Sequence, residues 1–375
     1  MIVGGAQENT LATVRGLVNK GKRVVLVTGP PLGPEGSLMD VAERTGAPVI
    51  MVPELRREIN PVLDFISLLK LYSIIRRNDC DIVHTHSSKA GILGRIAAKL
   101  AGTRVIVHTI HGLPFHPYQN RLLNMLYIWL ERFAARFTDR IITVCDAMTE
   151  KAVRAGVAKE SRFLTIYSGM DLEPFVSAAS SREETRKQLG IRPGEKVVGK
   201  IGRFFPLKGH RYLVQASPAI VKKFPETRFL LVGDGILKDE LKRQIEALGM
   251  KDRFIFTGLV KSEEMPRLIS AMDVLVHASL REGLARVLPQ ALAVGRPAVS
   301  FDVDGAREVV VPGKSGFLVP AKNVDALADA VVEVLSSAGK FGTSVRGLVD
   351  PLFRQETMVD GIDKLYNELL EQKAS

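Results

Sequence analysis

The sequence predicts an α/β protein with two doubly wound domains. Short β-branched apolar runs alternate with longer helical patterns along the chain, and one polar segment interrupts this alternation near the middle. The chain has 375 residues, enough for two domains of ordinary size. Its 46% hydrophobic and 25% charged residues are typical of globular proteins.

The first half of the chain contains six candidate strands. They are expected at residues 23–29, 48–53, 81–86, 104–110, 140–146 and 163–169. These runs are apolar almost without alternation, as expected when helices cover both faces of a parallel sheet. Helical stretches such as residues 89–102 lie between them, so the pattern predicts repeated β-α-β units.

A polar segment at residues 173–195 separates the two halves. It contains Ser180-Ser181 and has prolines near both ends, so we expect a domain boundary there, between residues 1–175 and 176–349. A second series of strands is expected at 197–203, 228–235, 254–260, 274–279 and 298–305. Residues 350–375 form a helical pattern with one apolar face and are expected to pack back toward the first domain. Two such Rossmann-like domains would face a central cleft that binds ligand.

The chain begins with a short apolar run and a glycine pair. Only Met1, Ile2 and Val3 precede Gly4 and Gly5, whereas a typical strand has five or six residues. A glycine pair after a strand lets the backbone approach a bound phosphate or acceptor. We therefore expect a functional loop on a truncated first strand, either because the true start lies upstream or because this strand is short.

Composition and net charge limit the functions that this protein is expected to have. The formal net charge of +11 favours anionic partners such as nucleotide phosphates, acidic lipid headgroups or nucleic acid. Nucleic acid is disfavoured because the basic residues are scattered and only 6% of residues are aromatic. Two cysteines, Cys80 and Cys145, predict neither a disulfide framework nor a metal site. With no secretory signal and no apolar run near 18 residues, a cytoplasmic location without a membrane span is expected.

The stretch "GRFFPLKGH" (202–210) is a candidate phosphate-binding loop. It follows a predicted strand and precedes a predicted helix. Gly202 lets the backbone turn, and Arg203 and Lys208 place two cations at the carboxyl end of the strand. The alternative is a solvated loop with two unrelated cations.

The stretch "REGLARVLPQALAVG" (281–295) is a second candidate. A helix is expected to start around Leu284 or Ala285, and a helix N-terminus favours anions. Glu282 precedes that helix and is better suited to accept hydrogen bonds from sugar hydroxyls than to bind phosphate. Gln290 follows two helical turns later. The alternatives are a helix-capping role for Glu282 and an ordinary helix position for Gln290.

Residues 82–130 contain no Asp or Glu but five of the seven histidines. Such a region suits anionic ligands. His84 and His108 are expected to be hydrogen-bonded core residues, and a metal site from His84, His86 and His111 is an alternative. Asp302-x-Asp304 is interpreted as a loop and not as a metal-binding pair.

The aromatic-rich helix at 120–137 has two interpretations. It is either a partly buried helix of the first domain or a helix that lies on a membrane surface, with Tyr127 and Trp129 at the interface.

The ordered motifs "GRFFPLKG", "VGDG", "FTGL", "REGLARVLPQALA" and "GKSGFLVP" resemble the retaining glycosyltransferases of the family-4 type, which have two Rossmann-like domains in the GT-B arrangement. The motifs "GGAQ", "HTIHG" and "YSGMDLEPF" extend the resemblance into the first half. It therefore covers nearly the whole chain, and the ordered set is far more specific than any single motif.

The resemblance implies roles for individual residues. Arg203 and Lys208 match the pair that holds the donor diphosphate, and Glu282 matches the carboxylate that meets the donor sugar. Gln290 departs from the family pattern, because it stands where a second glutamate usually holds the ribose hydroxyls. His111 matches a histidine near the transferred sugar. Further matches to donor-binding or glycine-loop positions are Gly4, Gly5, Gly202, Gly233, Leu259, Val260, Leu284 and Ala285.

The resemblance also implies the reaction. The protein is expected to transfer a hexosyl group from a nucleotide-diphosphate sugar to a glycan or lipid-linked acceptor, with retention and without a metal or resident cofactor. Cell-envelope polysaccharide, including lipopolysaccharide or exopolysaccharide, is the implied product, with peripheral contact at the inner face of the membrane as one option. The alternatives are a nucleotide-sugar epimerase and a catalytically weak nucleotide-sugar-binding protein. A dinucleotide-dependent oxidoreductase is disfavoured because G-x-G-x-x-G is absent.

Overall fold

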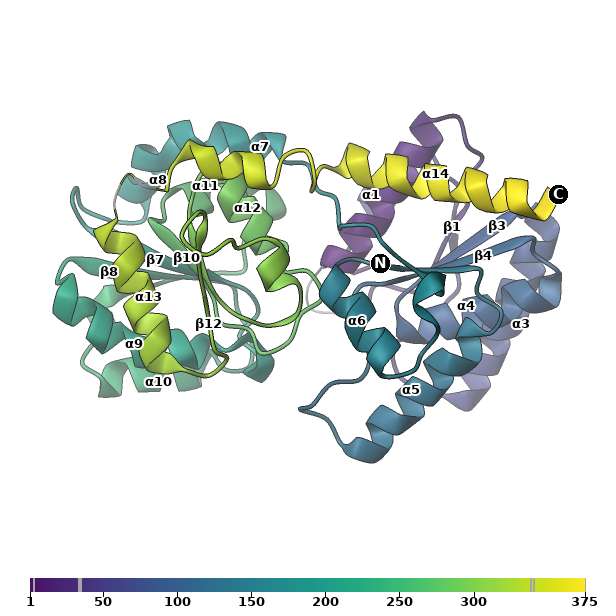
Figure 1. Ribbon diagram of the computed structural model, residues 1–375, viewed down its shortest axis with the longest axis horizontal. Helices are drawn as coiled ribbons and strands as arrows, with labels where there is room; N and C mark the ends of the chain where they lie inside the picture. Colours follow the sequence, from purple (N-terminus) through teal and green to yellow (C-terminus); the bar gives the residue numbers. More distant parts are fainter. Residues whose placement is uncertain (3, 33–35, 338, 340, 375) are drawn as a thin grey trace. The chain divides into compact units, whose positions relative to one another are not determined.

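The computed structural model describes residues 1–2, 4–32, 36–337, 339 and 341–374. The chain divides into two compact units, Met1–Met170 with Phe353–Ser375, and Asp171–Leu352 (Figure 1). Each unit is built on parallel strands covered by helices, so the predicted α/β class is correct. The boundaries lie at 170 and 352, close to the expected 175 and 349.

The first unit contains a four-stranded parallel sheet in the order β3-β4-β5-β6 and a separate parallel pair, β1-β2. Its strands are β1 (Leu26–Thr28), β2 (Val49–Met51), β3 (Ile82–His86), β4 (Val105–Ile110), β5 (Arg140–Thr143) and β6 (Phe163–Thr165). Its helices are α1 (Gly5–Asn19), α2 (Met39–Glu43), α3 (Pro61–Asn78), α4 (Ser88–Ala101), α5 (Arg121–Ala135), α6 (Asp146–Arg154) and α14 (Gln355–Ala374). All six strands were predicted, with ends that differ by a few residues.

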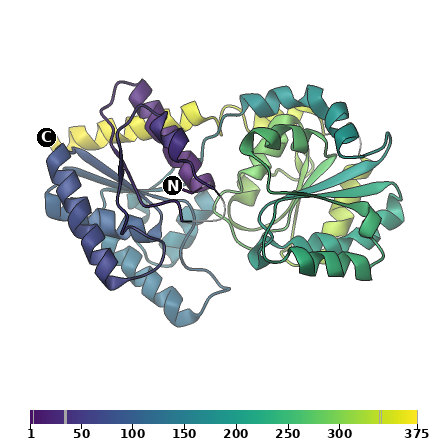
Figure 2. The ribbon, with the colours of Figure 1, turned by 180° about the vertical axis from the view of Figure 1, so that it is seen from behind.

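The central strand β4 shows how both faces of this sheet are buried. Ile106 packs with Leu71 of α3 and with α4, whereas the flanking Val105 and Val107 pack against α14 and Leu17 of α1. Figure 2 shows α14 beside α1 in this unit. Alternate side chains of one strand thus serve two helical layers, which explains the nearly continuous apolar sequence of β4.

The N-terminal segment forms an isolated bridge before α1. Ile2 pairs with Ser37 in an antiparallel bridge, Gly4 is extended, and α1 begins at Gly5. Val3 lies outside the described residues. Among the N-terminal residues that the structure describes, an isolated β-bridge therefore precedes the glycine pair in place of a complete strand.

The second unit has one six-stranded parallel sheet in the order β12-β11-β10-β7-β8-β9. Its strands are β7 (Lys196–Ile201), β8 (Thr227–Val232), β9 (Phe254–Gly258), β10 (Val274–His277), β11 (Ala298–Phe301) and β12 (Gly316–Val319), the last of which was not predicted. Its helices are α7 (Glu173–Ser177), α8 (Arg182–Gln188), α9 (His210–Lys223), α10 (Lys238–Ala247), α11 (Met265–Ser270), α12 (Val287–Val294) and α13 (Val324–Ser336). The strand order reverses between neighbours β7 and β10, and such a switch point opens a ligand crevice at the carboxyl ends of the strands.

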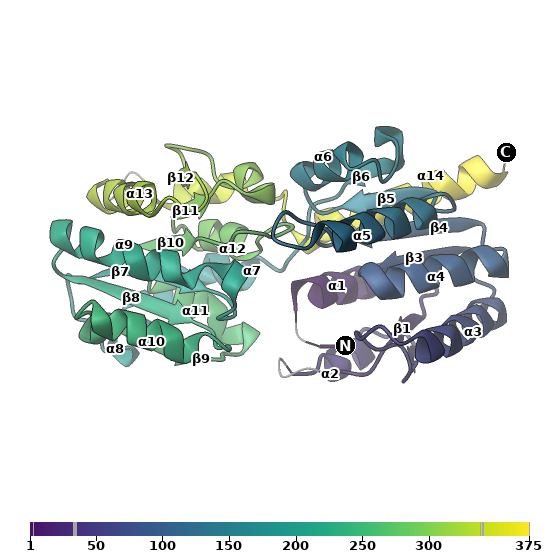
Figure 3. The same ribbon diagram turned by 90° about the horizontal axis from the view of Figure 1, so that it is seen from below.

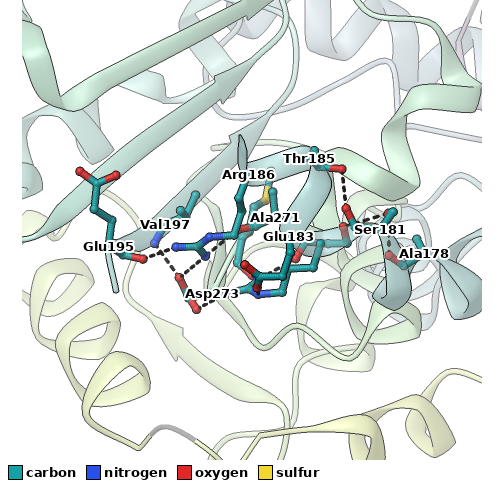
Figure 4. A network of polar contacts seen from close by, with 12 residues as sticks. Ala178, Ser181, Glu183, Thr185, Arg186, Glu195, Val197, Ala271 and Asp273 are labelled. Atoms are coloured by element: carbon teal, nitrogen blue, oxygen red, sulfur yellow. Dashed lines mark hydrogen bonds and ion pairs between the residues drawn. The ribbon is translucent and has the colours of Figure 1, made fainter. Parts of the chain in front are cut away.

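The polar segment 173–195 is largely helical and belongs to the second unit. Asp273 holds it there, because its carboxylate accepts hydrogen bonds from Arg182 of α8 at 2.7 Å and from the backbone N–H of Val197 at 2.7 Å. Arg186 also reaches Asp273, at 3.4 Å (Figure 4). Ion pairs with Asp273 thus anchor α8, which explains why a segment of polar composition is folded into this unit.

Two further observations concern membrane-spanning helices and the two cysteines. No helix within the described ranges is both long and apolar enough to span a bilayer. Cys80 is half-buried and Cys145 is buried, and both are free thiols.

Candidate active site

The structure brings Lys208 and Glu282 into direct contact. Lys208 ends a short 3-10 helix, Pro206–Lys208, in the loop after β7, and Glu282 lies in the loop after β10. The ammonium Nζ of Lys208 lies 2.5 Å from Oε1 of Glu282. The backbone N–H of Leu280 donates to the carbonyl of Leu207 at 2.8 Å and joins the two loops. This ion pair therefore sits at the switch point between β7 and β10.

Glycines allow the loops at this edge to approach closely. Gly209 has φ of 65°, and a Cβ there would lie 1.9 Å from the carbonyl oxygen of Ala278. Gly202 and Gly233 have φ of 147° and 134°, and a Cβ on Gly233 would lie 2.2 Å from the carbonyl oxygen of Gly202. Side chains at Gly209 and Gly233 would separate these loops, and the positive φ of Gly202 favours glycine there.

Glu282 is held as a carboxylate by its neighbours. Burial alone would raise its pKa, but Lys208 and His277 outweigh this effect and the pKa of Glu282 lies well below its ordinary value. Nε2 of His277 lies 3.5 Å from Glu282, and Nδ1 of His277 lies 3.3 Å from Oγ of Ser300. The backbone N–H of Glu282 donates to Asp304 at 2.6 Å, which fixes the loop. The carboxylate is therefore ionised and positioned to accept hydrogen bonds.

A buried ammonium, which the sequence analysis missed, belongs to this charged region. Lys200 lies on β7 with only 1% of its surface exposed. Burial lowers the pKa of Lys200 to about 7, helped by Lys208 and opposed by Glu282. Burial and the nearby Lys200 also lower the pKa of His210, the first residue of α9, to about 2. A lysine within the apolar run "VVGKIGR" was the available signal, because charged residues are rarely fully buried.

Arg203 lies in the same loop as Lys208 but is exposed. Its guanidinium is 5.1 Å from the ring centroid of Phe205, a cation–π contact. The next residue, Phe204, is fully buried, and its N–H donates to the carbonyl of Asp234 in the loop after β8 at 2.8 Å. The loop is thus anchored beside Arg203 while the guanidinium faces outward.

The predicted start of the helix after Glu282 was slightly wrong. Leu284 and Ala285 are buried in an irregular segment, and α12 begins two residues later, at Val287. The N–H of Gln290 donates to the carbonyl of Arg286 at 3.2 Å, as expected inside a helix. Its side chain is half-buried, and its amide makes no side-chain hydrogen bond within the described residues.

Leu259 and Val260 follow β9 at the same carboxyl edge of the second sheet. Leu259 is 68% exposed, and Val260 is half-buried. The segment thus lies near the surface at this edge of the sheet.

The first unit carries a histidine cluster at the carboxyl ends of its strands. Nδ1 of His86, at the end of β3, lies 3.0 Å from Nε2 of His111, just after β4. His84 contacts the hydroxyl of Tyr366 through Nδ1 at 2.5 Å and that of Thr109 through Nε2 at 2.7 Å. Burial lowers the pKa of His86 to about 4, and burial together with the other histidines lowers that of His84. These two histidines are therefore neutral near pH 7.

His108 is a hydrogen-bonded core residue, as predicted. It is 2% exposed, and its Nδ1 lies 2.8 Å from Oγ1 of Thr85. Gly4 and Gly5 lie at the start of α1 in the same unit as His111. Sequence reasoning missed Tyr366, which α14 brings back to β3 from the far end of the chain.

The candidate metal positions make other contacts. Asp302 forms an ion pair with Arg307 at 2.9 Å, and Asp304 accepts the hydrogen bond from Glu282. Within the described ranges, no group of three or more His, Cys, Asp or Glu side chains is arranged to hold a metal ion. The interpretation of Asp302-x-Asp304 as a loop holds for Asp302, which follows β11, whereas Asp304 begins a short 3-10 helix, Asp304–Glu308.

Comparisons with known proteins identify the family of this chain. The family descriptions "Glycosyltransferase Family 4" and "Glycosyl transferases group 1" match residues 3–174 and 181–342. An Escherichia coli UDP-Gal:alpha-D-GlcNAc-diphosphoundecaprenol alpha-1,3-galactosyltransferase is 32% identical over 86% of this chain and 84% of its own length. The Staphylococcus aureus capsular polysaccharide biosynthesis glycosyltransferase CapM is 25% identical over 85% of this chain and 84% of its own length.

Solved structures share the fold. The Anabaena protein Alr3699/HepE, crystallised in complex with UDP, has a TM-score of 0.82 and 24% identity, with 97% of this chain and 96% of that chain covered. Sucrose-phosphate synthase from Thermosynechococcus elongatus has a TM-score of 0.81 and 24% identity, with 99% and 94% covered. The two-unit arrangement is thus the GT-B fold. The chain belongs to the glycosyltransferases of the group 1, family 4 type.

Proposed function

We propose that this protein is a retaining hexosyltransferase that uses a nucleotide-diphosphate sugar and builds a cell-envelope or exopolysaccharide glycan. The Lys208–Glu282 pair at the switch point of the second sheet carries this proposal. The Escherichia coli relative, named for UDP-Gal and a diphosphoundecaprenol-linked GlcNAc, supports a UDP-sugar donor and a lipid-linked acceptor. The relative CapM supports a role in polysaccharide synthesis, and lipopolysaccharide is a further candidate product.

The donor binds on the second unit in this proposal. Arg203 and Lys208 hold the diphosphate, and Glu282 accepts hydrogen bonds from hydroxyls of the donor sugar. Gly202 and Gly233 let the backbone approach the phosphates. The other donor contacts are the backbone at Leu259, Val260, Leu284 and Ala285 and the amide of Gln290, which meets the ribose hydroxyls without charge.

The transfer step needs positive potential at the leaving group. The bond between the anomeric carbon and the phosphate oxygen breaks, and the acceptor oxygen bonds to the anomeric carbon on the same face. The proton of the acceptor hydroxyl passes to the leaving phosphate oxygen. Arg203 and Lys208 stabilise the charge that develops on the diphosphate. No metal or resident cofactor is required in this scheme, and activity is expected to persist in EDTA.

The acceptor binds on the first unit in this proposal. Gly4 and Gly5 bring the start of α1 close to it, and His111 lies near the transferred sugar. Hydrogen bonding to His86 orients the ring of His111. A nucleotide-sugar substrate and the free thiols of Cys80 and Cys145 suit a reducing cytoplasm, with peripheral contact at the inner face of the membrane.

The test is a transfer assay with product analysis. The purified protein is incubated with a UDP-sugar and a polyprenyl-diphosphate-linked sugar, with and without EDTA, and NMR determines the anomeric configuration of the product. The same configuration as in the donor, with undiminished turnover in EDTA, is expected. Inversion, or strict loss of turnover in EDTA, would contradict the mechanism.

The same assay separates the alternatives. Donor binding without any transfer would indicate the catalytically weak binding protein. A donor converted to its epimer without an acceptor would indicate the epimerase, which the relatives described above do not support.

A further inference from the structure

The amino ends of three neighbouring strands in the second sheet carry a separate group of charges. Lys196 begins β7, Asp273 immediately precedes β10, and Arg296 lies two residues before β11. These strands are parallel and adjacent in the order β11-β10-β7, so their amino ends lie at one edge of the sheet. The six residues of β7 rise about 3.3 Å each, so this edge lies roughly 16 Å from the carboxyl edge with Lys208 and Glu282.

A pocket of about 110 Å³ lies at this amino edge. Lys196, Asp273 and Arg296 line it, together with Leu335 and Ser337 at the end of α13. Helix α13 packs on β10, β11 and β12 (Figure 3), and all the residues that line the pocket belong to the second unit. A single bound water needs about 10–15 Å³ of such space, so the pocket has room for an oxyanion of the size of phosphate. We call it the Arg296 pocket.

The carboxylate of Asp273 is already engaged by other partners. Its Oδ1 pairs with Arg182 at 2.7 Å, and its Oδ2 accepts the N–H of Val197 at 2.7 Å. Arg186 also pairs with Oδ2, at 3.4 Å (Figure 4). Both arginines of α8 donate in addition to backbone carbonyls at residues 270–272. The charge of Asp273 is therefore shared between two arginines before Arg296 is considered.

Arg296 is the unsatisfied cation of this pocket. Its side chain is half-buried, and its Nε is shielded from solvent without a hydrogen-bond acceptor. Burial lowers the pKa of Arg296 to about 10, neighbouring arginines lower it further, and Asp273 opposes them. The guanidinium is thus charged at pH 7 and surrounded mainly by like charge. Buried polar groups in proteins are nearly always hydrogen-bonded, so an unpaired guanidinium in a pocket indicates a position for an anionic ligand.

The charge balance of the pocket favours an oxyanion with more than one negative charge. Lys196 and Arg296 both line the pocket, and neither forms an ion pair within the described residues. Of the described residues that line it, only Asp273 carries a carboxylate, and that carboxylate pairs with two arginines. The carboxyl end of α13 adds only about half an elementary charge of negative sign. A guanidinium presents parallel N–H donors that match two oxygens of a phosphate.

We propose that the Arg296 pocket binds phosphate, either as the free ion or as the phosphate group of a small phosphorylated metabolite. Arg296 donates to two phosphate oxygens, Lys196 supplies a second positive charge, and the hydroxyl of Ser337 donates a further hydrogen bond. None of these residues belongs to the proposed donor site. Phosphate bound here therefore stabilises the second unit without competing with the donor, and the inference stands independently of the proposed function.

The test measures phosphate binding by the full chain. Thermal shift and calorimetric titration are carried out with inorganic phosphate and with glycerol 3-phosphate, at an ionic strength held constant with potassium chloride. Phosphate is expected to raise the melting temperature of the unchanged chain and of Lys208→Ala alike, because it binds the folded state. Tighter binding of glycerol 3-phosphate would identify a phosphorylated metabolite as the ligand, and equal or tighter binding of inorganic phosphate would identify the free ion.

Variants assign the binding to the pocket. Arg296→Gln is expected to weaken phosphate binding about tenfold, and Lys196→Gln, the second variant, about fivefold. In phosphate-free buffer, Arg296→Gln should melt at the same temperature as the unchanged chain or higher, because it removes an unpaired cation. The matched control is Arg243→Gln, which removes the same charge from the exposed side of α10 and should keep the phosphate affinity of the unchanged chain.

Four results would overturn the proposal. The first is no binding of either phosphate compound. The second is binding that Lys208→Ala abolishes and Arg296→Gln leaves intact, which would assign the phosphate to the donor edge. The third is equal weakening by Arg243→Gln, which would indicate a nonspecific effect of charge. The fourth is a lower melting temperature of Arg296→Gln in phosphate-free buffer with unchanged phosphate affinity, which would make Arg296 a structural residue.

Discussion

The carboxyl edges of the two sheets have the same architecture and opposite chemistry. In the second unit, Lys208 and Glu282 form an ion pair, and both influence the buried amino group of Lys200. In the first unit, His86 contacts His111 and is held neutral by burial. A charged edge suits an anionic diphosphate, and a neutral hydrogen-bonding edge suits an uncharged hydroxyl. In the proposed function, the same β-α-β scaffold serves two substrates through the residues at its strand ends.

The largest expected effect on activity comes from removing Lys208 at the charged edge of the second sheet. Lys208→Ala removes the cation that is proposed to stabilise the leaving diphosphate, and it leaves Glu282 without its ion-pair partner. The expected loss in kcat/KM is about 10²–10³-fold, as for other groups that stabilise developing charge. Steady-state kinetics with a UDP-sugar measure it.

A matched control is available on the first unit. Lys70 pairs with Glu54 at 2.7 Å and is also partly exposed, so Lys70→Ala removes an ion pair of similar geometry away from the donor site. It is expected to keep its activity. Unchanged donor affinity in both Lys208→Ala and Arg203→Ala would contradict the assignment of the diphosphate site.

A second prediction tests whether Lys200 contributes charge to the same edge. Its ammonium is protonated below a pH of about 7 and loses its proton as the pH rises through that value. The affinity for a UDP-sugar should therefore fall between pH 6 and pH 8. Lys200→Met should bind the donor about tenfold more weakly at pH 6 and lose this pH dependence. Calorimetric titration at the two pH values measures both effects.

The control for Lys200 lies on the same strand. Lys196→Met changes a half-buried lysine at the opposite end of β7 and should leave the pH dependence intact. An unaltered pH profile in Lys200→Met would show that Lys200 has no part in donor binding.

A third prediction concerns His86, at the neutral edge of the first sheet, and the pH dependence of stability. The pKa of His86 is about 4 in the folded state and near 6.5 when unfolded, so the unfolded chain binds more protons between these values. The free energy of unfolding should therefore fall as the pH drops from 7 to 5. In His86→Asn this fall should be smaller by about 1–2 kcal/mol. Urea unfolding at both pH values tests it, and equal falls in the two proteins would contradict a buried neutral His86.

The smallest effect is expected at Gln290. Gln290→Glu restores the carboxylate that the family usually has at this position, and donor affinity should stay the same or rise by up to about fivefold. Donor titration measures the change. A complete loss of donor binding would mean that Gln290 has a different role.

Much of the fold follows from local patterns. The apolar runs at β3, β4 and β7 predicted buried parallel strands because their side chains face helices on both sides. The segment that forms α7 and α8 was interpreted as a domain boundary because it is polar, and the ion pairs that hold α8 depend on Asp273, which lies far away in the sequence. Strand β12 went unrecognised because its four residues follow a tight turn and carry little periodic signal.

The site was predictable in its residue types but not in its contacts. Arg203, Lys208 and Glu282 were identified from loops that follow strands. The ion pair between Lys208 and Glu282 spans 74 positions and depends on β7 lying beside β10, which local sequence does not encode. The burial of Lys200 and the contact of Tyr366 with His84 depend in the same way on tertiary packing.

The most direct test of the donor site is a thermal-shift screen with UDP-, GDP- and ADP-sugars. A ligand that binds the folded state raises its melting temperature by mass action. One nucleotide class is expected to stabilise the protein and Lys70→Ala equally, with the shift abolished in Lys208→Ala. An undiminished shift in Lys208→Ala, or no shift with any nucleotide sugar, would contradict a donor site built on the Lys208–Glu282 pair.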